Sequence, residues 1–199
     1  SITPQILRSL VSNKVVLILG PRRTGKTELI NHILKSVGEK FIMLNGDDQS
    51  SHSLLEERTT ENYISLIGNN KIIAIDEAQK INEIGLKLKL IVDTVPGIKI
   101  LATGSSAFDL SNKLGEPLTG RKRTFHLFPF SQSEYSTIEN LIETKGRLKE
   151  RIIFGCYPEL LHMKDRNDKA SYLSELVSSY LLKDILVFVG IRNAKTILD

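Results

Sequence analysis

The eight residues from Gly20 to Thr27 constrain this chain more than any other stretch of it. They read Gly20, Pro21, Arg22, Arg23, Thr24, Gly25, Lys26 and Thr27, which fits the pattern G-x-x-x-x-G-K-[ST]. The unbroken apolar run before them predicts a strand buried on both faces, and the apolar periodicity after them predicts a helix. A strand, a glycine loop and a helix in this order are the context of a phosphate-binding P-loop. We therefore expect these eight residues to bind a nucleotide triphosphate.

The residue types of this loop suit phosphate chemistry. Glycine lets successive backbone N–H groups curl around a phosphate, and the N-terminus of the following helix adds its dipole. Lys26 is expected to reach the β- and γ-phosphates, and the Thr27 hydroxyl to ligate Mg²⁺. The motif thus predicts ATP with Mg²⁺ as the ligands.

A second feature is the acidic pair Asp76-Glu77, which ends the apolar run Ile72 to Ile75. Asp76 is expected to hold Mg²⁺ through water, and Glu77 to polarise a water molecule that attacks the γ-phosphate. The alternative is an ordinary strand that ends in a solvated acidic turn. The P-loop earlier in the chain favours the catalytic interpretation, because both motifs belong to one phosphate site.

A third apolar run, from Ile98 to Ala102, ends in the hydroxyl-rich stretch Thr103-Gly104-Ser105-Ser106. Ligands of open α/β sheets bind at the carboxyl ends of the strands, so one of these hydroxyls could sense the γ-phosphate or hold the attacking water. We take Ser105 as a nucleotide-binding residue, with Thr103 and Ser106 as open alternatives. A serine-rich turn that caps the next helix is the competing interpretation.

Arg121 follows Gly120 and precedes an alternating stretch, residues 123–130, that predicts a last strand. An arginine here could stabilise the charge on the transferred phosphate, as arginine fingers do. The alternative is a basic rim of the strand.

The order of these patterns predicts an α/β P-loop NTPase fold, with a mostly parallel sheet and helices on both faces, over residues 1–130. Residues 131–199 are predicted to form a helical cap. It starts at the capping box Ser131 to Glu134 and is interrupted at residues 155–158.

Composition limits the environment and the partners. The net charge of +4 is small, and it divides evenly between the two halves of the chain, so it argues only weakly for nucleic acid. The single cysteine, Cys156, fits a reducing compartment, and no apolar run reaches membrane length. We expect a cytoplasmic protein without a membrane partner.

Four segments together resemble a known family: GPRRTGKT, IIAIDEAQ, ILATGSSAFDL and LTGRKRTFHLFPFSQSEY. They look like the AAA+-related P-loop ATPases of bacteria and archaea in which an AAA_14 domain precedes a DUF4143 domain. The resemblance covers essentially the whole chain. The stretches GCYPELL and SYLLKDILVFVGIRNAKTILD look like the start of the second domain. The resemblance therefore implies that the chain is part of a longer protein and that its C-terminal domain is truncated.

The resemblance also implies roles for individual residues. It assigns Lys26 and Thr27 to the Walker A motif, Asp76 and Glu77 to the Walker B motif, and Arg121 to the catalytic machinery. Sensor 1 would be Thr103, Ser105 or Ser106, and sensor 2 would be Arg151 or Arg192. Gly155-Cys156-Tyr157-Pro158 is similar to the GGYP of the family, with cysteine at the second glycine, and to the G-x-P motif of STAND-type NTPases. In those NTPases the proline packs on the adenine, which implies that the base lies near Tyr157 and Pro158.

These features favour an Mg²⁺-dependent ATPase that works as a switch, with Glu77, Lys26 and Arg121 as the catalytic residues. The alternative is a nucleotide-binding module that hardly hydrolyses and presents surfaces to a protein or DNA partner. A P-loop kinase is disfavoured because the acidic pair suits water as the acceptor. A GTPase is disfavoured because guanine-specific proteins of this class carry the motif N-K-x-D. The closest stretch here, Asn112-Lys113-Leu114-Gly115, ends in glycine instead of aspartate. Expected partners are ATP, further copies of the chain, and DNA or protein through the C-terminal domain.

Overall fold

The computed structural model describes residues 2–105 and 118–181. These residues form two compact units, which are described separately. The first contains residues up to 21 and from 25 to 127, and the second contains residues 22–24 and those from 128 onward. The sequence predicts a boundary after residue 130, and that domain division stays a prediction.

The first unit alternates helices and strands along the chain, as expected for an α/β fold. Its elements are α1 (Thr3–Ser9), β1 (Lys14–Leu19), α2 (Lys26–Val37), β2 (Phe41–Asn45), α3 (Gln49–Leu54), α4 (Thr60–Ile67), β3 (Ile72–Asp76), the short 3₁₀ helix η1 (Ala78–Lys80), α5 (Ile84–Thr94), β4 (Lys99–Gly104) and β5 (Lys122–His126).

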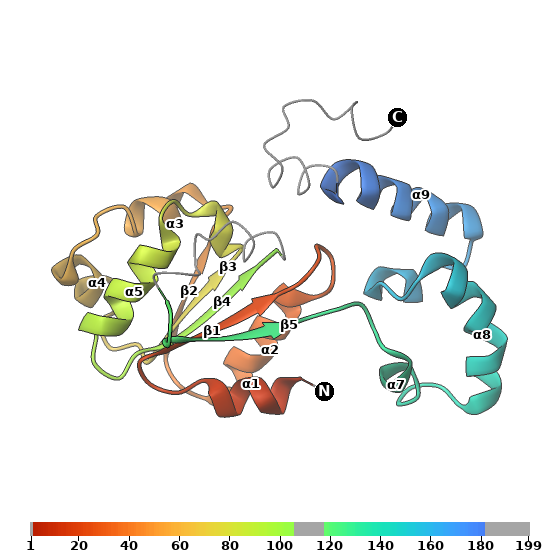
Figure 1. Cartoon of the computed structure of the whole chain (residues 1–199), viewed down its shortest axis with the longest axis horizontal. Coiled ribbons are helices and arrows are strands. Elements are labelled where there is room, and N and C mark those ends of the chain that lie inside the picture. The colour runs from red at the N-terminus through yellow and green to blue at the C-terminus, as the bar shows by residue number, and fades with distance from the viewer. Residues whose placement is uncertain (1, 106–117, 182–199) are drawn as a thin grey trace. The chain divides into compact units, whose positions relative to one another are not determined.

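The five strands form one parallel sheet in the order β2-β3-β4-β1-β5. The predicted α/β fold with a parallel sheet is therefore confirmed, and Figure 1 shows its strands side by side. Strand β5 ends at His126, earlier than the alternation to Phe130 predicts. Leu127 still donates a backbone hydrogen bond to Leu19 at 2.7 Å, and pairing stops there.

Strand β1 is buried on both faces, because the sheet lies between two layers of helices. Val15, Leu17 and Leu19 pack in a cluster with side chains of α4 and α5, and Val16 and Ile18 pack in another with side chains of α1 and α2. All five side chains are fully buried. This explains why the strand is apolar at every position rather than alternating.

Parallel pairing brings the carboxyl ends of all strands to one edge of the sheet. The loop after β1, the acidic pair after β3 and the hydroxyl residues at the end of β4 therefore share that edge. Arg121 immediately precedes β5, which is parallel to β1, so it lies at the opposite, amino edge. There its carbonyl accepts a hydrogen bond from the Val15 N–H at 2.9 Å.

The second unit is helical, as the sequence predicts. It contains α7 (Gln132–Tyr135), α8 (Leu141–Phe154), η2 (Pro158–Leu161), α9 (Arg166–Leu176) and a π-helical turn, η3 (Val177–Leu181). The predicted capping box is present, with the Ser131 hydroxyl accepting from the Glu134 N–H and the Glu134 carboxylate accepting from the Ser131 N–H. The Phe130 and Tyr135 rings meet edge to face, with centroids 5.8 Å apart.

Helix α8 begins at Leu141 because of the side chain of Asn140. The Asn140 side chain accepts hydrogen bonds from the N–H groups of Ile142 and Glu143, and the Glu143 side chain bonds back to the Asn140 N–H. This second capping box starts the helix at Leu141, and Gly155, at a φ of 79°, ends it.

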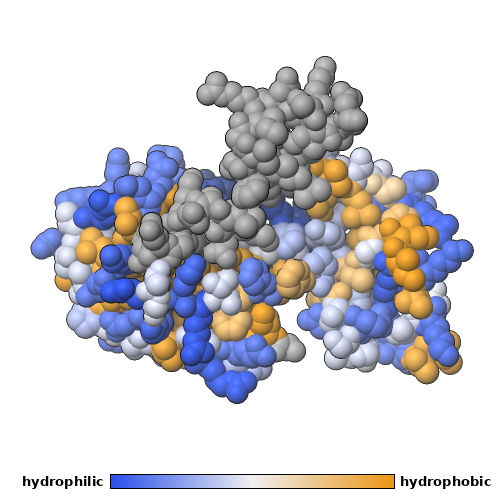
Figure 2. All heavy atoms as spheres, viewed as in Figure 1, coloured by the Kyte–Doolittle hydropathy of each residue, from blue (hydrophilic) through white to orange (hydrophobic). Residues whose placement is uncertain are grey.

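Large apolar side chains lie exposed around α8. Figure 2 shows hydrophobic (orange) atoms on the surface of the second unit. The exposed residues of this region are Ile138, Leu141, Ile142, Leu148, Ile152 and Ile153. No α8 residue is buried, so this helix contributes little to an interior of the second unit.

Candidate functional site

The P-loop is held by its own backbone and by Lys26. Gly25 adopts the left-handed conformation at a φ of 90°, which L-amino acids with a side chain rarely adopt, and α2 begins at the next residue. A side chain at Gly20 would place its Cβ 2.1 Å from the carbonyl oxygen of Leu127, so only glycine fits there. The two glycines of the motif are thus required for different reasons.

Lys26 is only 4% exposed, which is unusual for a lysine. Its ammonium donates hydrogen bonds to the carbonyl oxygens of Gly20 at 3.0 Å and Pro21 at 2.9 Å. The charge is therefore folded into the concave side of the loop, close to the N-terminus of α2. Both features favour an anion at this position.

Asp76 is the centre of the polar contacts at the carboxyl edge. It is buried at 5% exposure, and the hydroxyl of Thr27 donates to its Oδ2 at 2.7 Å. The hydroxyl of Thr103, at the end of β4, donates to Oδ1. Three elements that are distant in sequence thus converge on one carboxylate.

These oxygens fit a magnesium ion. Neighbouring ligands of an octahedral Mg²⁺ are roughly 3 Å apart, and Thr27 Oγ1 and Asp76 Oδ2 are separated by a similar distance. Among residues 2–105 and 118–181, no cluster of three or more His, Cys, Asp or Glu side chains could hold a metal ion. Mg²⁺ is usually held by one or two protein oxygens together with phosphate oxygens and water, and Thr27 and Asp76 offer two such oxygens.

Glu77 lies in a constrained turn beside this carboxylate. It has a φ of 49°, which non-glycine residues rarely adopt, and its N–H donates to the Thr103 hydroxyl at 3.1 Å. Thr103 therefore connects Asp76 and Glu77. Ser105 is also buried but forms neither of these bonds, and Ser106 lies outside the described residues.

Two residues at this site were not anticipated from the sequence. Gln79 donates from Nε2 to Glu77 Oε2 at 2.5 Å, and Gly46, after β2, packs against the Glu77 carbonyl. Gln79 ends the family-like segment IIAIDEAQ, but that segment by itself assigns no role to the glutamine. Gly46 could have been found from the turn Asn45-Gly46, which follows the strand next to β3.

Arg121 is not brought to the P-loop of its own chain. Its Nε forms an ion pair with Asp93 at 2.7 Å, and it is separated from the loop by the length of β1, roughly 20 Å for six residues. The interpretation as a basic rim and a role in a neighbouring chain both agree with this position. A role in its own site does not follow from it.

The remaining predicted residues belong to the second unit. The tip of the loop, residues 22–24, groups with this unit, and Arg23 pairs there with Glu175 at 3.1 Å and Glu159 at 3.5 Å. Tyr157 and Tyr172 meet edge to face, with ring centroids 6.4 Å apart. Pro158 opens η2.

Of the sensor 2 candidates, Arg151 lies over the Tyr135 ring, 3.7 Å from its centroid, and pairs with Glu139. The hydrogen bond from Arg151 holds the pKa of Glu139 below its usual value, and Arg147 adds to this effect. Arg192 lies outside the described residues.

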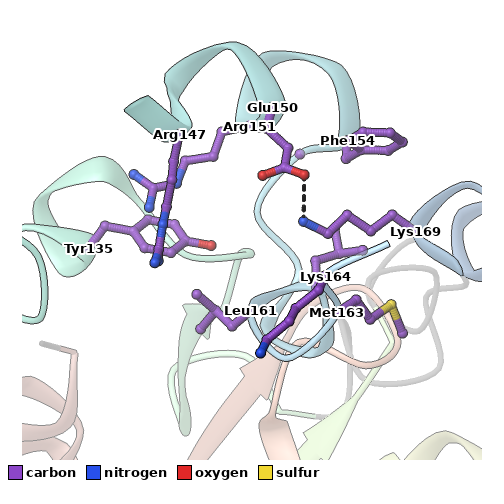
Figure 3. A pocket seen from close by; sticks show the side chains of 11 residues that line it. Tyr135, Arg147, Glu150, Arg151, Phe154, Leu161, Met163, Lys164 and Lys169 are labelled. Atoms are coloured by element: carbon purple, nitrogen blue, oxygen red, sulfur yellow. Dashed lines mark hydrogen bonds and ion pairs between the residues drawn. The ribbon is translucent and has the colours of Figure 1, made fainter. Parts of the chain in front are cut away.

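The second unit also contains a cavity of about 320 Å³ (Figure 3). Basic and apolar side chains line it together, and an ion pair between Glu150 and Lys169, 2.8 Å long, spans one side. The lining residues are Tyr135, Arg147, Glu150, Arg151, Phe154, Gly155, Leu160, Leu161, Met163, Lys164 and Lys169. Apart from Arg151, none of these was a predicted site residue.

Within the described part of the chain, every helix is too short or too polar to cross a membrane.

Comparison with known proteins identifies similar chains. An uncharacterized protein of Methanocaldococcus jannaschii is 32% identical over 94% of this chain and 45% of its own length. An uncharacterized protein of Mycobacterium tuberculosis is 28% identical over 94% of this chain and 40% of its own. The chain thus spans less than half the length of these two relatives.

Among solved structures, the Pif1 helicase from Candida albicans matches with a TM-score of 0.47 and 17% identity, over 73% of this chain and 43% of that one. The family model described as the AAA domain matches residues 12–136, which is more than half of the chain and includes all five strands. The chain therefore belongs to the AAA domain family.

Proposed function

We propose that this AAA-type nucleotide-binding module hydrolyses ATP with Mg²⁺ and works as a switch. The observation that carries the proposal is the pair of hydrogen bonds on Asp76, from Thr27 of the P-loop helix and Thr103 of β4. A buried carboxylate that bonds to the P-loop threonine is what a metal–triphosphate site of this kind needs. An acidic turn that only faces solvent would not need these two hydrogen bonds to Asp76.

In the proposed complex the N–H groups of residues 20–25 and the Lys26 ammonium bind the phosphates. Thr27 and Asp76 hold Mg²⁺, directly or through water. The ion, when bound, neutralises charge that develops on the phosphate oxygens. Lys26 would exchange its two loop carbonyls for phosphate oxygens, which bind the ammonium more strongly because they are charged.

Glu77 is the proposed general base. A water molecule loses a proton to its carboxylate while the water oxygen bonds to the γ-phosphorus. The bond from that phosphorus to the β–γ bridging oxygen breaks, and its electron pair stays on ADP. Thr103, which bonds to both acidic residues, is the hydroxyl we assign to sensor 1 in place of Ser105.

Three further assignments belong to the proposal. Tyr157 and Pro158 bind the adenine, as the resemblance of residues 155–158 to the G-x-P motif implies. Arg121 acts on the transferred phosphate of a neighbouring copy of the chain. The cellular partner, a protein or DNA, binds through the remainder of a DUF4143 domain.

The experiment compares Lys26→Ala and Glu77→Gln in the longest natural form of the protein. Lys26→Ala should weaken ATP binding in calorimetry because it removes a charge from the phosphates. Glu77→Gln should bind ATP normally and hydrolyse it about 10²–10⁴ times more slowly, since only the base is lost.

Glu83→Gln is the matched control. Glu83 has a φ of 50°, close to that of Glu77, but it is exposed and pairs with Arg58 at 3.3 Å. Its turnover should equal that of the wild type. If Glu77→Gln hydrolyses ATP at the wild-type rate, Glu77 is not the base. If the wild type binds ATP without turnover, the protein is the alternative, a binding module that presents surfaces to partners.

A further inference from the structure

Gln79 lies two residues after Glu77, on the short helix η1, and it bonds to the Glu77 carboxylate. Its Nε2 donates to Glu77 Oε2 at 2.5 Å. The orientation of the amide follows from chemistry, because an ionised carboxylate only accepts hydrogen bonds and the Gln79 oxygen would be repelled there. Gln79 therefore occupies one of the two carboxylate oxygens and leaves the other, Oε1, for a different partner.

The other end of the Gln79 amide is unsatisfied. Its Oε1 is buried and has no hydrogen-bond partner among the residues that the structure describes. Buried amide oxygens almost always have a donor, so an exception needs an explanation. A water molecule beside the γ-phosphate would supply one, because it has two O–H groups and gives only one of them to the base.

The backbone around Glu77 is fixed, which leaves its side chain as the part that needs orienting. Thr103 binds the Glu77 N–H at 3.1 Å, and the Glu77 carbonyl accepts from the Lys80 N–H at 3.0 Å. Gly46 packs against the same carbonyl. With the main chain held on both sides, the Glu77 carboxylate still has three side-chain torsions, and Gln79 is the described residue that restrains them.

We propose that Gln79 is the positioning residue of Glu77: its Nε2 holds one carboxylate oxygen, and its Oε1 accepts a hydrogen bond from the water that Glu77 deprotonates. The proton moves from the water to Glu77 Oε1, and Gln79 neither gains nor loses one. The inference rests on the proposed ATPase activity and adds the residue that aligns base and water.

The test measures kcat and KM for Gln79→Ala and Gln79→Met in the longest natural chain. Gln79→Met keeps nearly the length of the side chain and adds no charge, but it removes the N–H donor and the amide oxygen. In both variants kcat should fall about 10- to 100-fold, which is the loss expected for a hydrogen bond to a charged group. KM and ATP affinity should change less than about twofold, because the Gln79 amide bonds to Glu77, which is predicted to act on the water and not to bind the phosphates. A purely structural role would lower kcat and raise KM together, or would leave both unchanged in the variant of similar size.

Combining each change with Glu77→Gln separates a role through Glu77 from an independent one. Without the base, Gln79 has only the water left to align, so Gln79→Ala should lower the slow turnover of Glu77→Gln by much less than it lowers the turnover of the wild type. Lys80→Ala is the matched control on the same turn, because Lys80 pairs with Asp47 and not with Glu77. Its kcat should stay at the wild-type value.

The possible outcomes distinguish the two proposals. Normal or increased kcat in the Gln79 variants, with slow Glu77→Gln, would overturn the role of Gln79 and leave the ATPase intact. Additive losses in the double variant would also overturn it. Wild-type turnover in Glu77→Gln would overturn the ATPase assignment of Glu77 itself. Gln79→Met fills nearly the same space as glutamine, so it keeps the test decisive if Gln79→Ala does not fold.

Discussion

At the scale of single residues, Gly46 has no room for a side chain. A Cβ on this residue would lie 2.2 Å from the Glu77 carbonyl oxygen and 3.3 Å from that of Asp76. The Gly46 N–H also donates to the Asp76 carbonyl at 2.8 Å. No flexible side chain can yield here, because both obstacles are backbone atoms.

Gly46→Ala should therefore shift the acidic turn, lower the free energy of unfolding by about 1–3 kcal/mol and reduce ATP turnover. Urea denaturation and an ATPase assay measure the two effects. Gly146→Ala is the control, since a Cβ there meets nothing within 4 Å, and in the middle of α8 it should stabilise by about 0.5–1 kcal/mol. Equal stability of Gly46→Ala and the wild type would show that the turn can move without cost.

At the scale of elements, α8 depends on its first turn. It buries none of its residues, so tertiary packing does little to hold it. The Asn140 Oδ1 accepts from Ile142 at 2.9 Å and from Glu143 at 3.0 Å. These two bonds satisfy N–H groups that otherwise have no partner inside the helix.

Asn140→Ala should cost about 0.5–2 kcal/mol and increase hydrogen exchange at the Ile142 and Glu143 amides. Asn167→Ala is the control at the start of α9, because that side chain is exposed and has no hydrogen bond among the described residues. Mass spectrometry of peptides from residues 140–154 follows the exchange. The same protection in Asn140→Ala as in Asn167→Ala would contradict the capping role.

At the scale of the whole molecule, the position of Arg121 requires a second copy if it is to act in catalysis. It lies at the amino edge of the sheet, and its exposed pair with Asp93 contributes at most about 1 kcal/mol. An arginine held only weakly at one edge can be recruited by a neighbouring subunit.

We expect Arg121→Ala to bind ATP nearly as well as the wild type and to hydrolyse it slowly, because its charge meets the phosphate only in the transition state. Mixing it with Glu77→Gln subunits, which retain Arg121, should restore part of the activity. Asp93→Asn, which breaks the ion pair and keeps the arginine, should hydrolyse ATP normally. If Arg121→Ala is fully active, or if the protein has a monomeric mass in ATP, Arg121 does not act in a neighbouring subunit and only forms part of the basic rim of the strand.

Much of the fold could be predicted because single residues carry strong local signals. The unbroken apolar run before Gly20 predicts a strand with two buried faces, and β1 contributes to both core clusters. The division between α3 and α4 has a weaker signal, because it depends on Asp48 and Thr59 acting as separate N-caps within one polar stretch.

The site was harder to predict, since it depends on contacts between strands. That Thr103, rather than Ser105, bonds to Asp76 follows from the register of β4 beside β3, which no local pattern encodes. Likewise, the edge at which Arg121 lies follows from the direction of β5.

The place of β1 between β4 and β5 has a consequence for how the chain is made. The strand is synthesised before both of its partners, residues 99–104 and 122–126. At roughly 5–20 residues per second, a ribosome needs about 5–20 s to produce the second partner. During that time one of the most apolar segments of the protein has neither neighbour, so the nascent chain is at its most vulnerable to aggregation before the nucleotide pocket can exist.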